Sequence, residues 1–90
     1  MIQSIHPEAE SEFEAAADYY NVREEGLGDD FSEEVFATID RIIKFPNSWP
    51  RSSYRTRRCL CNRFPYSVIY RNTDTHLTIY AVAHQKRKPG

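Results

Sequence analysis

Residues 57–88 decide the fold, and they read RRCLCNRFPYSVIYR at positions 57–71 and, after a polar turn, HLTIYAVAHQKRK at positions 76–88. β-branched and aromatic residues, which favour strands, recur along this stretch. Pro65 cannot donate a ladder hydrogen bond, and Asn72–Thr75 has the composition of a hairpin turn. The stretch therefore predicts three strands, at Tyr54–Asn62, Tyr66–Arg71 and His76–Ala83.

Two features predict how these strands face the core. The last strand contains an almost continuous apolar run, Ile79–Ala83, which is typical of a central strand buried on both faces. In the first strand, alternation places Arg57 with the neighbouring cysteines on one face, and Arg58 and Leu60 on the other. Because Leu60 is apolar, we expect Arg58 near the edge of the core and Arg57 pointing outward.

The first half of the chain predicts a short strand followed by two helices. Met1–Ile5 has the pattern of an edge strand, and Pro7 suits the first position of a helix. An apolar stripe at helical spacing follows, formed by Ala9, Phe13, Ala16, Ala17 and Tyr20. We expect this helix to end near Glu25, with Gly26 as its C-terminal cap.

A second helix is expected directly afterwards, capped by Asp29 or Asp30 and ended near Lys44 by the proline at position 46. Its apolar positions at helical spacing are Phe31, Val35, Ile39 and Ile42. The short link between the helices predicts an antiparallel hairpin, and Trp49 is expected to pack against the second helix. The predicted fold is α+β, in the order β-α-α-β-β-β, with the helices packed on one face of a mostly antiparallel sheet.

The composition indicates one folded domain spanning residues 1–90. The chain is 40% hydrophobic and 28% charged, which fits a globular protein. No apolar run approaches the roughly 20 residues of a membrane span, and the N-terminus lacks the features of a secretory signal. We therefore expect a cytoplasmic protein that does not associate with membranes.

Charge is distributed unevenly along the chain. Residues 1–50 contain three basic and twelve acidic residues, a net charge of -9, whereas residues 51–90 contain nine basic and one acidic residue, a net charge of +8. Such asymmetry indicates a face that binds a polyanion or an acidic partner. An equally acceptable interpretation is that acidic helices lie across a basic sheet and neutralise it.

Cys59 and Cys61 are the only cysteines. On a strand they share a face along one chain, a geometry that does not favour a mutual disulfide. A structural zinc site needs about four ligands, and the sequence offers no second cluster. We therefore expect small apolar residues on a sheet, with no metal site and no cofactor.

Several short motifs, taken together, resemble the RelE/ParE superfamily of toxins from type II toxin–antitoxin systems. The resemblance covers essentially the whole chain and depends on the joint order and spacing of the motifs. They are Tyr19-Tyr20, Gly26-Leu27-Gly28, Arg57-Arg58, Phe64-Pro65-Tyr66, Ile69-Tyr70-Arg71 and Ala81-Val82-Ala83-His84, with Arg87 and Pro89 after them.

The resemblance implies a small toxin that a protein antitoxin neutralises in a hetero-oligomer. Such toxins are often encoded on plasmids, which they stabilise, or on bacterial chromosomes. Toxins similar to RelE cut mRNA on the ribosome, whereas toxins similar to ParE act on DNA gyrase without cutting RNA. The antitoxin is expected to wrap the helical hairpin, to lie along the basic sheet or to add a strand at the apolar edge of the first strand.

Metal-free RNA cleavage requires an acid, a base and cations that hold the charge of the phosphate. Histidine can exchange protons near neutral pH, and guanidinium groups bind phosphate oxygens bidentately. The candidate catalytic residues are therefore His84, Arg87, Arg58 and Arg71. Residues expected to bind nucleic acid or another target are Arg55, Arg57, Arg63, Lys86, Lys88, Tyr66 and Tyr70, the tyrosines by stacking on bases.

Two departures from the RelE-like pattern favour a ParE-like or divergent toxin. RelE-like ribonucleases commonly carry an arginine directly after the aromatic residue that opens the middle strand, where this chain has Ser67. They also tend to carry a basic pair in the preceding strand, but the alternate partner of Arg58 is Leu60. A RelE-like mRNA endoribonuclease, which would be an enzyme, and a non-toxic or decayed toxin-fold binding protein are the alternatives.

Purely structural roles are also compatible with these residues. Arg58 and Arg71 could pair with helix carboxylates such as Glu33 or Asp40. His84 could hydrogen-bond to the backbone at the end of its strand.

Overall fold

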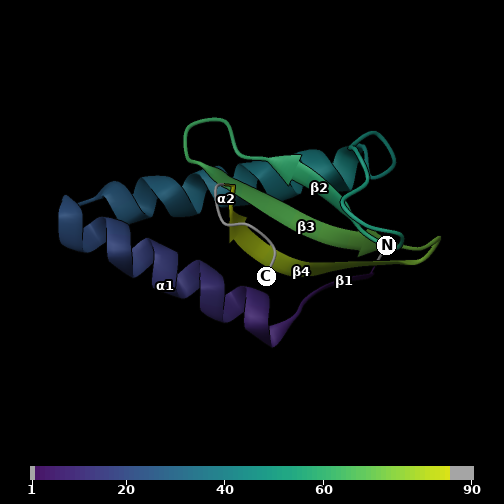
Figure 1. Cartoon of the computed structure of the whole chain (residues 1–90), viewed down its shortest axis with the longest axis horizontal. Helices are drawn as coiled ribbons and strands as arrows, with labels where there is room; N and C mark the ends of the chain where they lie inside the picture. Colours follow the sequence, from purple (N-terminus) through teal and green to yellow (C-terminus); the bar gives the residue numbers. More distant parts are fainter. Residues whose placement is uncertain (1, 86–90) are drawn as a thin grey trace.

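The structure, a computed structural model, describes residues 2–85 and confirms the predicted α+β order. Its elements are β1 (Ile2–Ile5), α1 (Pro7–Arg23), α2 (Leu27–Lys44), β2 (Arg57–Leu60), β3 (Tyr66–Asn72) and β4 (His76–His84). The strands form one sheet in the order β1-β4-β3-β2, with β1 parallel to β4 and the other pairs antiparallel. The two helices pack on one face of this sheet (Figure 1).

Helix α1 begins where the sequence predicts. Pro7 occupies its first turn, and the imidazole of His6 accepts a hydrogen bond from the amide of Glu8 at 3.2 Å. The predicted apolar stripe faces the core: Ala9 and Ala16 are buried, and the larger stripe residues pack around them. The helix ends at Arg23, about two residues earlier than the prediction.

The turn between the helices depends on two glycines. Gly26 has φ +85°, a left-handed conformation that favours glycine. It occupies the N-cap position of α2, so the prediction that Asp29 or Asp30 caps this helix is wrong. Both aspartates lie in the first turn instead, where carboxylates suit the positive end of the helix dipole. Gly28 lies against α1, since a Cβ there would meet the carbonyl oxygen of Ala17 at 2.2 Å.

The predicted orientation of β2 is wrong. Cys59 and Cys61 face the core and are 2% and 6% exposed, whereas Leu60 is 51% exposed. Arg58 therefore points away from the helices, on the face of the sheet that the helices leave open. Arg57 lies on the helix side, where its guanidinium donates to the carbonyl oxygen of Trp49 at 2.8 Å. The strand is also shorter than the predicted Tyr54–Asn62.

Strand β4 is central, as predicted, but it is not buried on both faces. A register shift in the β3–β4 ladder pairs Tyr70 with Ile79 and Ile69 with Ala81, which leaves Tyr80 as an extra residue. The shift lets Leu77, Ile79 and Val82 all face the helices and become buried, although 79 and 82 differ in parity. The apolar run therefore does not mean that both faces of β4 are buried. It arises because the bulge turns both Ile79 and Val82 toward the helices.

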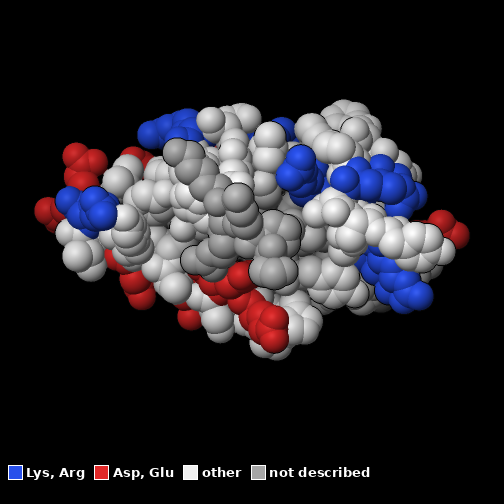
Figure 2. Space-filling view, viewed as in Figure 1, with Lys and Arg blue, Asp and Glu red and all other residues white. Residues whose placement is uncertain are grey.

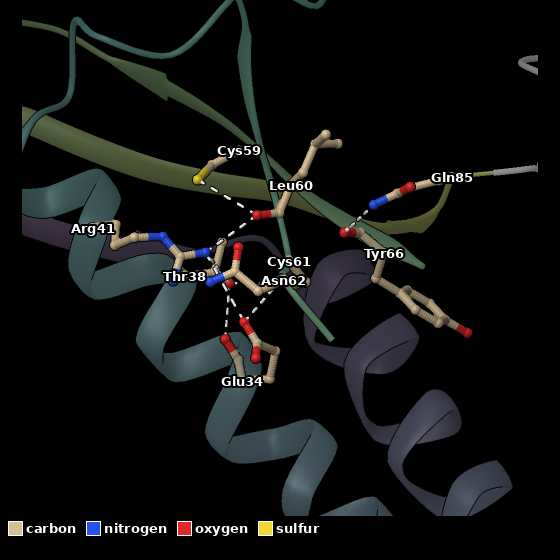
Figure 3. Close-up of polar contacts among 9 residues, drawn as sticks. All are labelled: Glu34, Thr38, Arg41, Cys59, Leu60, Cys61, Asn62, Tyr66 and Gln85. Carbon is tan, nitrogen blue, oxygen red and sulfur yellow. Dashed lines mark hydrogen bonds and ion pairs between the residues drawn. The ribbon is translucent and has the colours of Figure 1, made fainter. Parts of the chain in front are cut away.

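Side chains of α2 close the outer edge of β2. Arg41 donates to the carbonyl oxygen of Leu60 at 3.2 Å, and Glu34 accepts from the amide of Asn62 at 3.1 Å (Figure 3). Farther along, the amide of Arg58 donates to the carbonyl oxygen of Pro50. Such covering protects an edge strand from pairing with another chain.

Both cysteines are small residues on or beside the sheet, and they lie in the core. They are free thiols, and burial raises the pKa of each. The hydroxyl of Thr38 lies 3.4 Å from the sulfur of Cys61 (Figure 3). Trp49 packs against the core cluster, and its packing against α2 in particular stays a prediction.

Candidate functional site

Three arginines meet at one end of the sheet. Arg51 and Arg55, from the loop before β2, and Arg71, from β3, line a shallow hollow of about 610 Å³ together with Tyr54. We call this group the arginine hollow. Most basic side chains visible in Figure 2 gather at this end, whereas most acidic side chains lie along α1 and near the α1–α2 turn, with one acidic patch at the basic end.

No carboxylate among the described residues neutralises these arginines. The two ion pairs within residues 2–85 both lie inside α2, joining Arg41 to Glu34 at 4.0 Å and Lys44 to Asp40 at 3.2 Å. The alternative in which helix carboxylates pair with Arg58 and Arg71 is therefore wrong. Both arginines project from the open face of the sheet, as the register of β2 and β3 requires.

His84 lies on the other face of the sheet. It is paired with Tyr66 across the β3–β4 ladder, and the two rings meet edge-on with centroids 5.1 Å apart. Both line a groove of about 460 Å³ between α1 and the sheet. Glu12 lines the same groove, and its carboxylate accepts a hydrogen bond from the amide of Val82 at 3.1 Å.

The structure thus separates the residues predicted to be catalytic. Arg58 and Arg71 occupy the open face, and His84 occupies the helix face. Arg87, the fourth of this group, and the predicted binding residues Lys86 and Lys88 lie outside the described residues. An acid or base and the phosphate-binding cations do not meet around one point within residues 2–85.

The other predicted binding residues have varied surroundings. Arg55 belongs to the arginine hollow, and Arg63 is exposed with its guanidinium 5.8 Å from the ring centre of Phe64. Tyr66 is half-buried among the rings of α1 and α2. Tyr70 is 0% exposed, so its ring cannot stack on a base in this structure.

An apolar groove runs beside the free edge of the sheet. It has a volume of about 310 Å³ and is lined by Gln3, Ser4, Ile5, Phe36, Ile39, Ile43, Leu77 and Ile79. Phe36 and Ile5 are 61% and 40% exposed, respectively. Among the described strands, none pairs with the outer edge of β1. The groove therefore combines exposed apolar side chains with an open strand edge.

Sequence reasoning missed Arg51, Tyr54 and Phe36. The first two occur in a loop rich in serine and proline, where a basic–aromatic cluster was the available signal. Phe36 lies beside the apolar stripe of α2 and not within it, and this position in the helix could have indicated that its ring is exposed.

Two further findings concern residues 2–85. They contain no group of three or more histidine, cysteine or acidic side chains placed to hold a metal ion. No helix in this part of the chain is long and apolar enough to cross a membrane.

A helical hairpin packs on one face of a small, mostly antiparallel sheet, and Arg58 and Arg71 project from the opposite face. The family model described as "ParE toxin of type II toxin-antitoxin system, parDE" matches residues 4–89. The chain therefore belongs to the ParE toxin family.

A solved structure entitled "Chromosomal ParDE TA system from P. aeruginosa" is similar to this chain. Its TM-score is 0.82 at 16% sequence identity, with 93% of this chain and 95% of that chain covered. This likeness supports the fold. No curated protein sequence matches the chain.

Proposed function

We propose that the protein is a cytoplasmic toxin that arrests growth by binding an essential target, DNA gyrase, rather than by cutting RNA. The observation that carries this proposal is the separation of His84 from Arg58 and Arg71 on opposite faces of the sheet. A binding toxin needs no such convergence, whereas general acid–base catalysis requires proton donor and phosphate binder to touch the same reacting group.

The surroundings of Ser67 support the same choice. It takes the position where RelE-like ribonucleases carry an arginine, and it is only 5% exposed. Its neighbours across the two ladders are Leu60 and Ala83, which have no titratable side chain. Within residues 2–85, the two ladder partners of Ser67 therefore supply neither a cation nor a proton-transfer group.

Induction of the toxin alone, without antitoxin, tests the proposal. We expect growth arrest, an SOS response and inhibition of gyrase supercoiling by the purified chain, with cellular mRNA intact in primer extension. His84→Ala is expected to remain toxic. Cuts in codon register, abolished by His84→Ala, would establish the ribosome-dependent endoribonuclease instead. Absence of toxicity would point to a decayed toxin that still binds an antitoxin.

The antitoxin is proposed to bind the apolar groove and the free edge of β1. The opposite edge, β2, is already covered by Arg41, Glu34 and Pro50. An extended antitoxin segment could add a strand to β1 and bury Phe36, and such addition is a common mode of peptide recognition. The resulting complex would be a toxin–antitoxin hetero-oligomer.

Two phenylalanines of similar exposure allow a matched test of this interface. Phe36 is 61% exposed inside the groove, and Phe45 is 59% exposed outside it. We expect Phe36→Asp to weaken co-purification with the antitoxin encoded by the neighbouring gene, and Phe45→Asp to leave it unchanged. Equal loss in both variants, or in neither, would place the antitoxin elsewhere, on the helical hairpin or the basic sheet.

A further inference from the structure

The loop that carries two arginines of the hollow is held in shape by its own hydrogen bonds. The guanidinium of Arg51 donates to the carbonyl oxygen of Tyr54 at 3.2 Å. The amides of Ser52 and Ser53 both donate to the carbonyl oxygen of Thr56, at 2.9 and 3.3 Å. The cationic groups therefore belong to a shaped turn, which lowers the entropy lost when a ligand binds.

The hollow is positively charged without local compensation. Residues 51–85 contain six arginines and one aspartate, Asp74. Within the described residues, none of Arg51, Arg55 and Arg71 forms an ion pair. Gathering like charges is unfavourable by itself, so a pocket of this kind is suited to a ligand that brings negative charge.

An aromatic ring stands beside these cations. Tyr54 lines the hollow and is 87% exposed, so nearly all of its ring is available to a ligand. Guanidinium groups bind phosphate oxygens in a bidentate manner, and exposed aromatic rings stack on unpaired bases. A phosphate-binding group with an adjacent stacking ring is the combination found in sites for single-stranded nucleic acid.

We propose that the arginine hollow binds single-stranded nucleic acid, with Arg51, Arg55 and Arg71 on the phosphates and Tyr54 stacked on a base. A duplex would keep its bases paired and would leave Tyr54 without a stacking partner. An acidic peptide would satisfy the charges but would give the ring no planar partner. The exposed ring therefore favours the single strand.

The hollow lies away from Ser67, the position where RelE-like ribonucleases carry an arginine. Arg71 is four residues beyond Ser67 on β3, which corresponds to about 13 Å at the usual rise of a strand. The inference goes beyond the proposed action on gyrase, and it stands or falls independently because it concerns binding of nucleic acid by the purified chain.

Fluorescence anisotropy with labelled oligothymidylate, measured from 50 to 200 mM salt, tests the site. Three phosphate contacts give a slope of log affinity against log salt of about −2, and Arg71→Gln is expected to reduce its magnitude by about 0.7. Tyr54→Ala should weaken binding about 5- to 150-fold, and Tyr54→Phe should retain it. Thermal unfolding of each variant verifies that it folds.

Arg23→Gln is the matched control, because it removes an exposed arginine in the last turn of α1, outside the hollow. We expect it to leave affinity and salt slope nearly unchanged. Equal effects of Arg23→Gln and Arg71→Gln would overturn the proposal in favour of a diffuse electrostatic attraction. So would equal affinity for a duplex of the same length, equal competition by polyglutamate, or the absence of oligothymidylate binding at 50 mM salt.

Discussion

Tyr70→Phe tests how the core is connected to the loop after α2. Tyr70 is fully buried, and its hydroxyl donates to the carbonyl oxygen of Pro46. The substitution keeps the ring but leaves this carbonyl without its donor. Losing a buried hydrogen bond in this way costs about 1–3 kcal/mol. We therefore expect the free energy of unfolding of the variant to be lower by about this amount at pH 7.

The same substitution should change the dependence of stability on pH. Burial raises the pKa of Tyr70 to about 12, whereas a tyrosine in an unfolded chain has a pKa of about 10. Between these values the unfolded chain has lost the proton that the folded chain retains, so stability falls as pH rises. The full effect is about 2–3 kcal/mol, at 1.36 kcal/mol per pKa unit, and it is present below pH 10 and lost through pH 12.

Urea unfolding from pH 7 to pH 12, followed by the fluorescence of Trp49, measures both effects. The stability difference between wild type and Tyr70→Phe should be largest at or below pH 9 and should shrink or reverse near pH 12. Tyr54→Phe, which removes an 87% exposed hydroxyl, should leave the unfolding midpoint at pH 7 unchanged. A constant difference across the whole pH range would refute the reasoning, as would a variant as stable as wild type at pH 7.

Substitutions at Gly28, Gly26 and Glu12 test the contacts of α1 and the turn that follows it. Gly28→Ala places a Cβ 2.2 Å from the carbonyl oxygen of Ala17, and we expect about 3 kcal/mol of destabilisation from forced separation of the helices. A Cβ at Gly26 would have no atom within 4 Å, so Gly26→Ala should lower stability only by the backbone strain of about 1–2 kcal/mol at its positive φ. Equal melting temperatures for the Gly28→Ala and Gly26→Ala variants would refute this expectation. Glu12→Ala should lower stability by about 1–2 kcal/mol and increase hydrogen exchange at the amide of Val82. Glu12→Gln should restore much of the lost stability. Unchanged hydrogen exchange at Val82 in Glu12→Ala would contradict the hydrogen bond between these residues.

The sequence predicted which segments form helices and strands better than it predicted which side of each strand faces the core. The helical stripe from Ala9 to Tyr20 and the proline at position 46 indicated both helices, because helix periodicity and proline act locally. The face of β2 was predicted wrongly, because only alternation was available and a shift of one residue reverses every side chain. Leu60 suggested an apolar face, yet Cys59 and Cys61 fill the core.

The candidate site shows the same limit. The position of His84 relative to Arg58 depends on the β3–β4 register and on the extra residue at Tyr80. A bulge leaves only a weak trace in a single sequence, since its residues look like any other apolar run. The basic charge of the second half could be read directly from composition, whereas its arrangement around Arg71 required the sheet.

The distribution of charge now favours one of its two interpretations. If acidic helices neutralised a basic sheet, ion pairs would join α1 or α2 to the strands. Both ion pairs within residues 2–85 lie inside α2 instead, and Arg71 projects from the face opposite the helices. Exposed ion pairs contribute little to stability, so pairing with these arginines would not have been needed for folding. Their gathering in one hollow therefore fits the proposed binding of an anion better than it fits neutralisation by the helices.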